Sequence, residues 1–183
     1  SMLDCQIAIL ENAIARYLSK NEIPGPMGSR HPSIAPFEAF KTKDSYIIIA
    51  AGNDKLFAKL CEVLKIPETT NDERFNSNSL RCENMDQLKE IFEKQLRSKS
   101  TNEWVKEMEA LKIPCGPIFN IKQAVENPQI QERNMIVKSY HKIIGEFKSA
   151  GNPIKMSTYK DENTRGDIPD LDEHREKIIK EFS

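Results

Sequence analysis

The chain has 183 residues, of which 38% are hydrophobic and 30% are charged, so its composition excludes a membrane protein and a low-complexity chain. Its 27 Lys and Arg residues nearly balance 28 Asp and Glu residues, and the net charge of -1 provides no field that would recruit nucleic acid. The longest apolar run, residues 46–51, is far shorter than the roughly 18 to 20 residues of a membrane-spanning helix. Because no signal-peptide pattern is present either, we expect a cytoplasmic protein without a membrane partner.

Apolar residues near the start of the chain recur at steps of three and four, which predicts one helix ending near Asn21. The buried face of this helix would carry Leu3, Ile7, Leu10, Ile14 and Tyr17 or Leu18. Residues 24–36 then read "PGPMGSRHPSIAP". Since these prolines and glycines interrupt regular hydrogen bonding, we expect a linker or a shaped loop.

Two β-rich segments follow the loop. "FEAFK" and "YIIIA" flank the polar residues "TKDS", which predicts an antiparallel hairpin whose second strand, residues 46–50, is buried on both faces. After this strand, Asn53 or Asp54 can accept a hydrogen bond from a free amide and so open a helix that ends near Lys65.

Two longer helices are predicted next, one from Asn84 and one from Ser100 or Thr101, where Ser100 and Glu103 offer a capping box. Charges of both signs alternate from Arg81 to Lys112, and this predicts a solvated helix surface. "IPCGPI" then indicates a rigid bend between helix and strand, with Cys115 in a structural role.

The last third of the chain mixes short elements with irregular segments. Asn120 is placed to cap a short helix through Val125, and "MIVKSY" and "EFKSA" predict a second hairpin, which could pair with the first. Residues 152–169 are polar and irregular, as in a linker. A final helix is expected over 171–182, with its apolar face turned inward; that face carries Leu171, Ile178 and Phe182.

Strong catalytic and metal-binding motifs are absent from the sequence. There is no Gly-rich phosphate cradle, no GxSxG and no HExxH. The cysteines form no CxxC pair and have no histidine at ligand spacing, so neither a metal site nor a disulfide framework is expected. Cys61 falls on the apolar face of its helix, where a thiol acts as a small hydrophobe.

Two places combine polar residues with loop or strand-end positions. His31 lies beside Ser29 in the Gly/Pro-rich loop, where functional residues concentrate, although a lone loop histidine is more often solvated or stabilises a turn. Asn53 and Asp54 follow a buried strand and open a helix, so they either cap that helix or face a ligand in front of the sheet. The residues alone favour capping.

Several segments, in order, resemble the second half of the CaiB/BaiF family, the class III (formyl-CoA type) CoA-transferases. They are "SMLDCQIAILEN", "HPSIAPFEAFKTKDSYIIIAAGNDKLFAKLCEVL", "WVKEMEALKIPCGPI" and "DEHREKIIKEF". The resemblance implies an α+β small domain over residues 34–150, with a small antiparallel sheet of hairpins packed against helices. Residues 1–33 and 151–183 would be linkers, each with one outer helix that belongs to a missing Rossmann-like domain, and two full-length chains would interlock as a homodimer.

The resemblance also implies the chemistry. In this family an aspartate of the N-terminal half attacks an acyl-CoA to give an anhydride and then an aspartyl-CoA thioester, which passes CoA to a carboxylic acid. Coenzyme A is thus part of the substrate, no cofactor is implied, and this chain would hold no catalytic residue and be inactive alone. Its contribution would be the acyl-facing loop over residues 28–32 and the strand end. The implied binding residues are Gly28, Ser29, His31, Gly52, Asn53 and Asp54.

Two alternatives remain open at this point. In the racemase branch of the family, an acidic residue at the place of Asp54 is an acid/base for 2-methylacyl-CoA thioesters, whereas transferase-like members commonly read "GND", as this chain does. The other alternative is a module without catalysis that binds a partner chain through its outer helices. The "GND" sequence favours the transferase.

Overall fold

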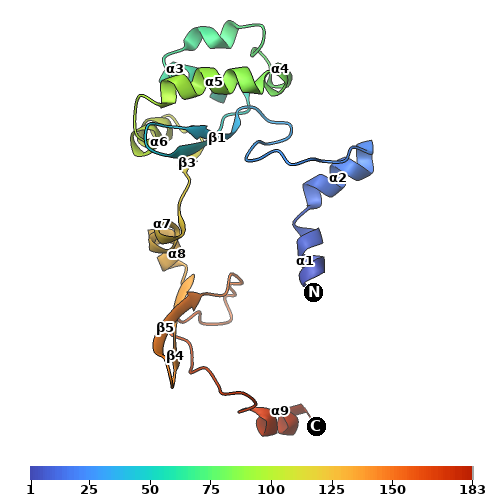
Figure 1. Ribbon diagram of the computed structural model, residues 1–183, viewed down its shortest axis with the longest axis vertical. Coiled ribbons are helices and arrows are strands. Elements are labelled where there is room, and N and C mark those ends of the chain that lie inside the picture. Colours follow the sequence, from blue (N-terminus) through green and yellow to red (C-terminus); the bar gives the residue numbers. More distant parts are fainter. Residues whose placement is uncertain (183) are drawn as a thin grey trace. The chain divides into compact units, whose positions relative to one another are not determined.

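The computed structural model describes residues 1–182 and divides the chain into two compact units, Ser1–Ile118 and Phe119–Ser183 (Figure 1). The mixed α+β class is confirmed. None of the helices within residues 1–182 combines the length and the apolar character that a bilayer crossing requires. The domain limits expected above, 1–33, 34–150 and 151–183, stay a prediction.

The first unit contains a three-stranded antiparallel sheet in the order β1-β2-β3. The predicted hairpin is confirmed as β1 (Phe37–Lys41) and β2 (Tyr46–Ala50). The bend expected at "IPCGPI" is instead a third strand, β3 (Cys115–Pro117), because its backbone pairs with β2. Pro117 is tolerated there because β3 lies at the edge of the sheet.

Burial along β2 alternates. Ile47 and Ile49 are completely buried, whereas Ile48 is half-buried and Tyr46 is exposed. The expectation of a strand buried on both faces is therefore wrong: the face with Ile47 and Ile49 is in the core, and the face with Tyr46 and Ile48 keeps contact with solvent, as is common in antiparallel sheets.

Helices complete the core of the first unit. Helix α5 (Met85–Leu96) packs on β1, and α6 (Thr101–Ala110) packs on β2, β3 and α3 (Asp54–Val63). Asn53 caps α3, and Ser100 and Glu103 form the predicted capping box of α6. The 3-10 helix η1 (Pro67–Asn71) and α4 (Asn78–Glu83) were not predicted, because such short helices carry no periodic signal.

The N-terminal segment forms two helices where one was predicted, α1 (Met2–Ala8) and α2 (Glu11–Lys20). The backbone leaves helical geometry at Leu10, while the predicted end is confirmed by the left-handed Asn21. Neither helix has a buried residue. Helices this short are marginal without a surface to pack against, because each must offset the cost of its own nucleation with few hydrogen bonds.

The second unit starts with α7 (Ile121–Glu126), capped by Asn120 as predicted, and α8 (Pro128–Glu132). The second hairpin, β4 (Ile136–His141) and β5 (Gly145–Ala150), forms a sheet of its own, so the suggested pairing with the first hairpin is wrong. Helix α9 (Arg175–Phe182) begins later than predicted. The predicted inward residues Leu171, Ile178 and Phe182 all lie at the surface, and so do most large apolar residues of α1 and α2.

Exposed apolar side chains on α1, α2 and α9 lead to the first expected result. Because apolar surface of this kind is stabilised by burial against a partner, we expect the purified chain to self-associate or to show rapid amide exchange over residues 3–19 and 171–182. Sedimentation and hydrogen exchange measure the two properties. A strict monomer with strongly protected amides in these helices would contradict the expectation.

Candidate functional site

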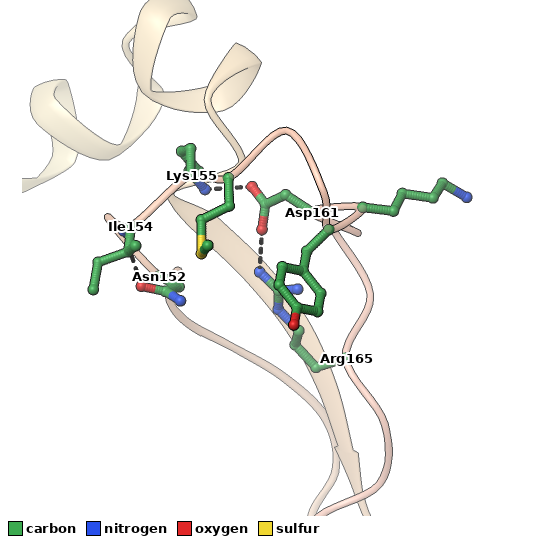
Figure 2. A pocket seen from close by; sticks show the side chains of 8 residues that line it. Asn152, Ile154, Lys155, Asp161 and Arg165 are labelled. Atoms are coloured by element: carbon green, nitrogen blue, oxygen red, sulfur yellow. Dashed lines mark hydrogen bonds and ion pairs between the residues drawn. The ribbon is translucent and has the colours of Figure 1, made fainter.

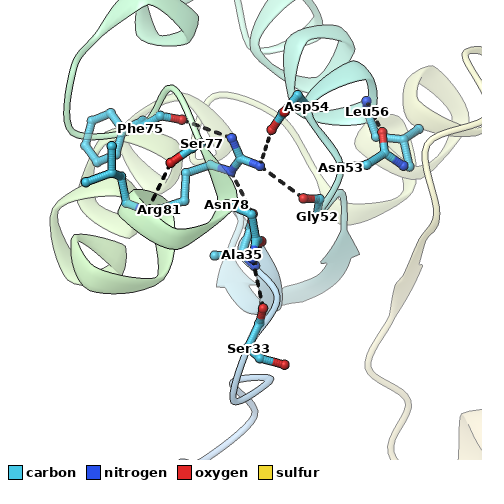
Figure 3. Close-up of polar contacts among 11 residues, drawn as sticks. Ser33, Ala35, Gly52, Asn53, Asp54, Leu56, Phe75, Ser77, Asn78 and Arg81 are labelled. Atoms are coloured by element: carbon cyan, nitrogen blue, oxygen red, sulfur yellow. Dashed lines mark hydrogen bonds and ion pairs between the residues drawn. The ribbon is translucent and has the colours of Figure 1, made fainter.

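The carboxyl end of β2 opens onto a hollow of about 460 Å³, which we call the strand-end hollow. It lies where the buried strand passes through Ala51 and Gly52 into α3, and apolar side chains make up most of its lining. Its lining residues are Ile34, Phe37, Ala50, Gly52, Asn53, Leu56 and Asn78. The surroundings of this strand end are drawn in Figure 3.

Gly52 is required at this turn by a close approach of another segment. A Cβ atom added at Gly52 would lie 2.0 Å from Cγ2 of Ile34, which is far inside van der Waals contact. The Gly52 carbonyl accepts a hydrogen bond from Nη2 of Arg81 at 3.0 Å. The wall of the hollow at residues 33–35 can therefore touch the strand end only because residue 52 has no side chain.

Asn53 and Asp54 have different structural roles. The Asn53 side chain caps α3 by accepting a hydrogen bond from the Leu56 N–H at 2.9 Å. Asp54 is the first helical residue and does not cap; its Oδ1 accepts from Nη2 of Arg81 at 2.8 Å, while the side chain stays 75% exposed. Capping thus belongs to Asn53, and the Asp54 carboxylate remains accessible beside the strand-end hollow.

Arg81 of α4 is the central polar residue behind this turn, and the sequence placed it wrongly on a solvated surface. Its side chain is 0% exposed. Besides Gly52 and Asp54, it donates from Nε to the Ala35 carbonyl at 2.9 Å and from Nη1 to the Phe75 carbonyl at 3.0 Å. Its guanidinium also lies 4.4 Å from the ring centre of Phe57. A six-residue helix has no periodicity that could have shown which residue is buried.

The predicted loop residues at 28–31 are anchored on β1. Gly28 adopts a positive φ of 64°, and the Ser29 hydroxyl accepts a hydrogen bond from the Ala39 N–H at 3.1 Å. The His31 ring stacks on Phe37 at 5.3 Å between centroids, and its Nδ1 accepts from the Ser33 N–H. His31 therefore stabilises the loop and packs against Phe37, which lines the strand-end hollow.

A second, charged hollow lies beside this loop. It has about 460 Å³ and is lined by Pro26, Met27, Gly28, Ser29, Arg30, Glu38 and Lys89. The buried Glu38 carboxylate accepts from Lys89 and from Nε of Arg30 at 3.1 Å, and Arg30 also binds Asp86 at 2.6 Å. The hydrogen bond to Asp86 contributes most to raising the pKa of Arg30. Gly28 and Ser29 thus line a different hollow from Gly52 and Asn53, so the six predicted residues do not meet in one cavity.

The predicted linker at 152–169 carries a hollow of its own, of about 380 Å³ (Figure 2). Asp161 accepts hydrogen bonds from Lys155 and, at 2.6 Å, from Arg165. These two bonds hold the pKa of Asp161 below its usual range. These ion pairs join residues 155, 161 and 165 of the irregular segment.

Cysteine chemistry plays no visible part in either unit. Cys61 is buried as predicted, and burial raises the pKa of its thiol to about 12, so the thiol stays protonated at neutral pH. The cysteines of residues 1–182 are all free, and no three His, Cys, Asp or Glu side chains in that range could hold a metal ion together.

The contact between residues 34 and 52 leads to a second expected result. Gly52→Ala should lower the free energy of unfolding by ~1 to 3 kcal/mol, because the new methyl group overlaps Ile34. Ile34→Ala in the same chain should restore part of the loss, since it removes the overlapping atom. Urea denaturation of the wild type, both single variants and the double variant measures the coupling. Strictly additive effects would show that the overlap is not the cause.

Comparisons with known proteins agree on one family. A model described as CoA-transferase family III matches residues 1–175. The chain is 37% identical to acetyl-CoA:oxalate CoA-transferase of Acetobacter aceti, over 100% of this chain and 46% of that protein. It is 32% identical to succinyl-CoA:glutarate CoA-transferase of Homo sapiens, over 99% of this chain and 41% of that protein.

The same result comes from solved structures. A crystal structure of a CaiB/BaiF family protein from Brucella suis superposes with a TM-score of 0.76 and 31% identity, over 100% of this chain and 47% of that one. The chain thus spans slightly less than half the length of the relatives it matches. With a family model covering residues 1–175, the chain belongs to CoA-transferase family III.

Proposed function

We propose that this chain is the C-terminal half of a class III CoA-transferase, which moves CoA from an acyl-CoA to a carboxylic acid. The observation that carries the proposal is the family match over residues 1–175, together with relatives named as CoA-transferases of oxalate and glutarate. These relatives are more than twice as long as the matched region. Under the proposal, the acyl-CoA thioester and the acid are substrates, and no other cofactor takes part.

This half of the enzyme closes the acyl side of the active site. The mostly apolar strand-end hollow, with Gly52 and Asn53 in its lining and the Asp54 carboxylate beside it, supports this role. The loop with Gly28, Ser29 and His31 lies on the adjoining strand, β1. The nucleophilic aspartate belongs to the other half of the enzyme.

The other half also covers the outer helices. Helices α1, α2 and α9 have no buried residue, and their exposed apolar side chains support contacts with that half and with a second chain in an interlocked homodimer. Such a homodimer is part of the proposal.

A racemase-like isomerase is the second candidate, because Asp54 presents an exposed carboxylate at the strand end. A general acid/base must reach the carbon from which it removes a proton. In this chain the carboxylate is bound to the buried Arg81 at 2.8 Å, which favours a structural role. The names of the matched relatives favour transfer as well.

The experiment first reads the coding sequence upstream of residue 3 and then expresses the longer protein, which we call the continuous protein. This protein should be incubated in D2O with an acyl-CoA and a carboxylic acid, and the CoA esters analysed by mass spectrometry. We expect a new acyl-CoA made from the acid and no deuterium at C2 of the donor. Deuterium incorporation without transfer would assign the racemase, and a stop codon upstream would support the module without catalysis.

Asp54→Asn provides the third expected result. Asparagine keeps an oxygen that can accept from Arg81, so the free energy of unfolding should change by less than ~1 kcal/mol and the transfer rate by less than about threefold. A direct acid/base would instead lose roughly a hundredfold or more in rate. Steady-state kinetics of the continuous protein distinguish the two. A collapse of transfer in a stably folded variant would make Asp54 a catalytic residue.

A further inference from the structure

The strand-end hollow is built from two segments that are distant in the sequence. One wall is residues 33–35, which contribute Ile34; the other is the turn at residues 52–54. The two walls meet where Ile34 lies against Gly52. Backbone pairing between β1 and β2 ends next to both walls, where the Ala51 N–H donates to the Pro36 carbonyl at 2.9 Å. Residues 33–35 and 52–53 lie beyond this last pair and belong to no helix or strand.

Helix α4 bonds to both walls. Asn78 donates from Nδ2 to the Ser33 carbonyl at 2.9 Å and accepts from the Ala35 N–H at 3.0 Å. Arg81, one turn further along, donates to the Ala35 carbonyl on the first wall and to Gly52 and Asp54 on the second. Figure 3 shows the guanidinium between these acceptors. A single short helix therefore ties the two walls together.

The chemistry of arginine suits this task. Four acceptors surround the Arg81 guanidinium, at 2.8 to 3.0 Å, and the planar group donates to all of them at fixed angles. Lysine has one nitrogen and could not span the same acceptors. Because Arg81 is 0% exposed, it cannot contact a substrate itself.

We propose that Arg81, with Asn78 beside it, is a positioning residue that sets the width of the acyl-binding hollow and the direction of the Asp54 carboxylate. This inference rests on the proposed function, which assigns the acyl group to that hollow. Arg81 and Asn78 form what we call the α4 clamp. Loosening the clamp moves the lining of the hollow and so weakens the binding of the acyl-CoA. The reacting groups on the other half of the enzyme stay unchanged.

The kinetic test compares Arg81→Lys and Asn78→Ser with Arg74→Lys in the continuous protein. Arg74 is a matched control, since it is a nearby arginine with an ion-pair partner, Asp72, and lines neither hollow described in this unit. We expect KM for the acyl-CoA to rise about tenfold in each clamp variant, with kcat within about threefold of wild type. The control should leave both constants unchanged.

Hydrogen exchange on this chain alone provides a second readout that needs no activity. The Ala35 amide donates to Asn78, and the Leu56 amide donates to the Asn53 cap on the other wall. Both clamp variants should speed exchange at residues 35 and 56 together by about tenfold, without changing α5 or α6. If Arg81→Lys does not fold, Asn78→Ser decides the question by exchange at residue 56, which is on the wall that Asn78 does not bond. KM does not decide it in that case, because Asn78 itself lines the hollow.

The outcomes separate the two claims. If the unsubstituted continuous protein transfers no CoA, the proposed function fails, and exchange in the chain alone still tests whether the clamp holds both walls. If transfer occurs but KM stays at the wild-type value in folded clamp variants, the positioning role is wrong. Exchange that changes only within α4 would also overturn it.

Discussion

Replacing Arg81 with leucine should lower the free energy of unfolding of the first unit by ~3 to 5 kcal/mol. The change removes the side-chain donors that bind three carbonyls, those of residues 35, 75 and 52. The arginine side chain that supplies these donors is 0% exposed. Each unsatisfied buried acceptor costs about 1 to 3 kcal/mol, and the new apolar side chain offsets only part of that cost. Asp54, being 75% exposed, regains water and contributes little to the loss.

Unfolding of the first unit can be followed through the fluorescence of the chain's single tryptophan. Trp104 is 3% exposed in α6, so its fluorescence reports unfolding of the first unit in urea. Arg74→Leu is the control, because Arg74 keeps 48% of its side chain exposed and should cost less than ~1 kcal/mol. If the two leucine variants lost the same stability, the buried hydrogen bonds of Arg81 would not be what holds the turn.

Purified by itself, the chain should transfer CoA at least ~10³-fold more slowly than the protein that continues into the upstream half. Transfer needs a free carboxylate to attack the thioester. At the two hollows described in the first unit, Asp54 is bound to Arg81, Asp86 is bound to Arg30, and the buried Glu38 lies between Arg30 and Lys89. Each of these carboxylates is paired with a cation, which makes it a weaker nucleophile than a free carboxylate.

Chromatography of the CoA esters measures this transfer. An excess of the acid and a high concentration of the chain make even slow transfer detectable. The matched sample is the continuous protein at the same concentration of sites. Saturable transfer by the chain alone would overturn the assignment of the nucleophile to the other half, and Asp54→Asn and Glu38→Gln would then identify which carboxylate acts.

Local signals in the sequence predicted most helices and the first hairpin. The sequence predicts helix starts at Asn53 or Asp54, at Ser100 with Glu103, and at Asn120. In the structure the caps are Asn53, the Ser100–Glu103 box and Asn120. A cap is formed by residues within one turn of each other, so its chemistry is complete in a short stretch of sequence. The resemblance to the family likewise depends on the order of such stretches.

Long-range contacts, in contrast, were decided only by the tertiary structure. "IPCGPI" pairs with β2 although it carries no strand pattern, and the second hairpin pairs with itself. The sequence predicts a surface position for Arg81, which is wrong because its acceptors at residues 35, 52 and 54 lie far away in the chain. The helix caps and the hairpin turns are properties of neighbours in sequence. The α4 clamp depends on residues 27 to 46 positions apart, which only folding brings together.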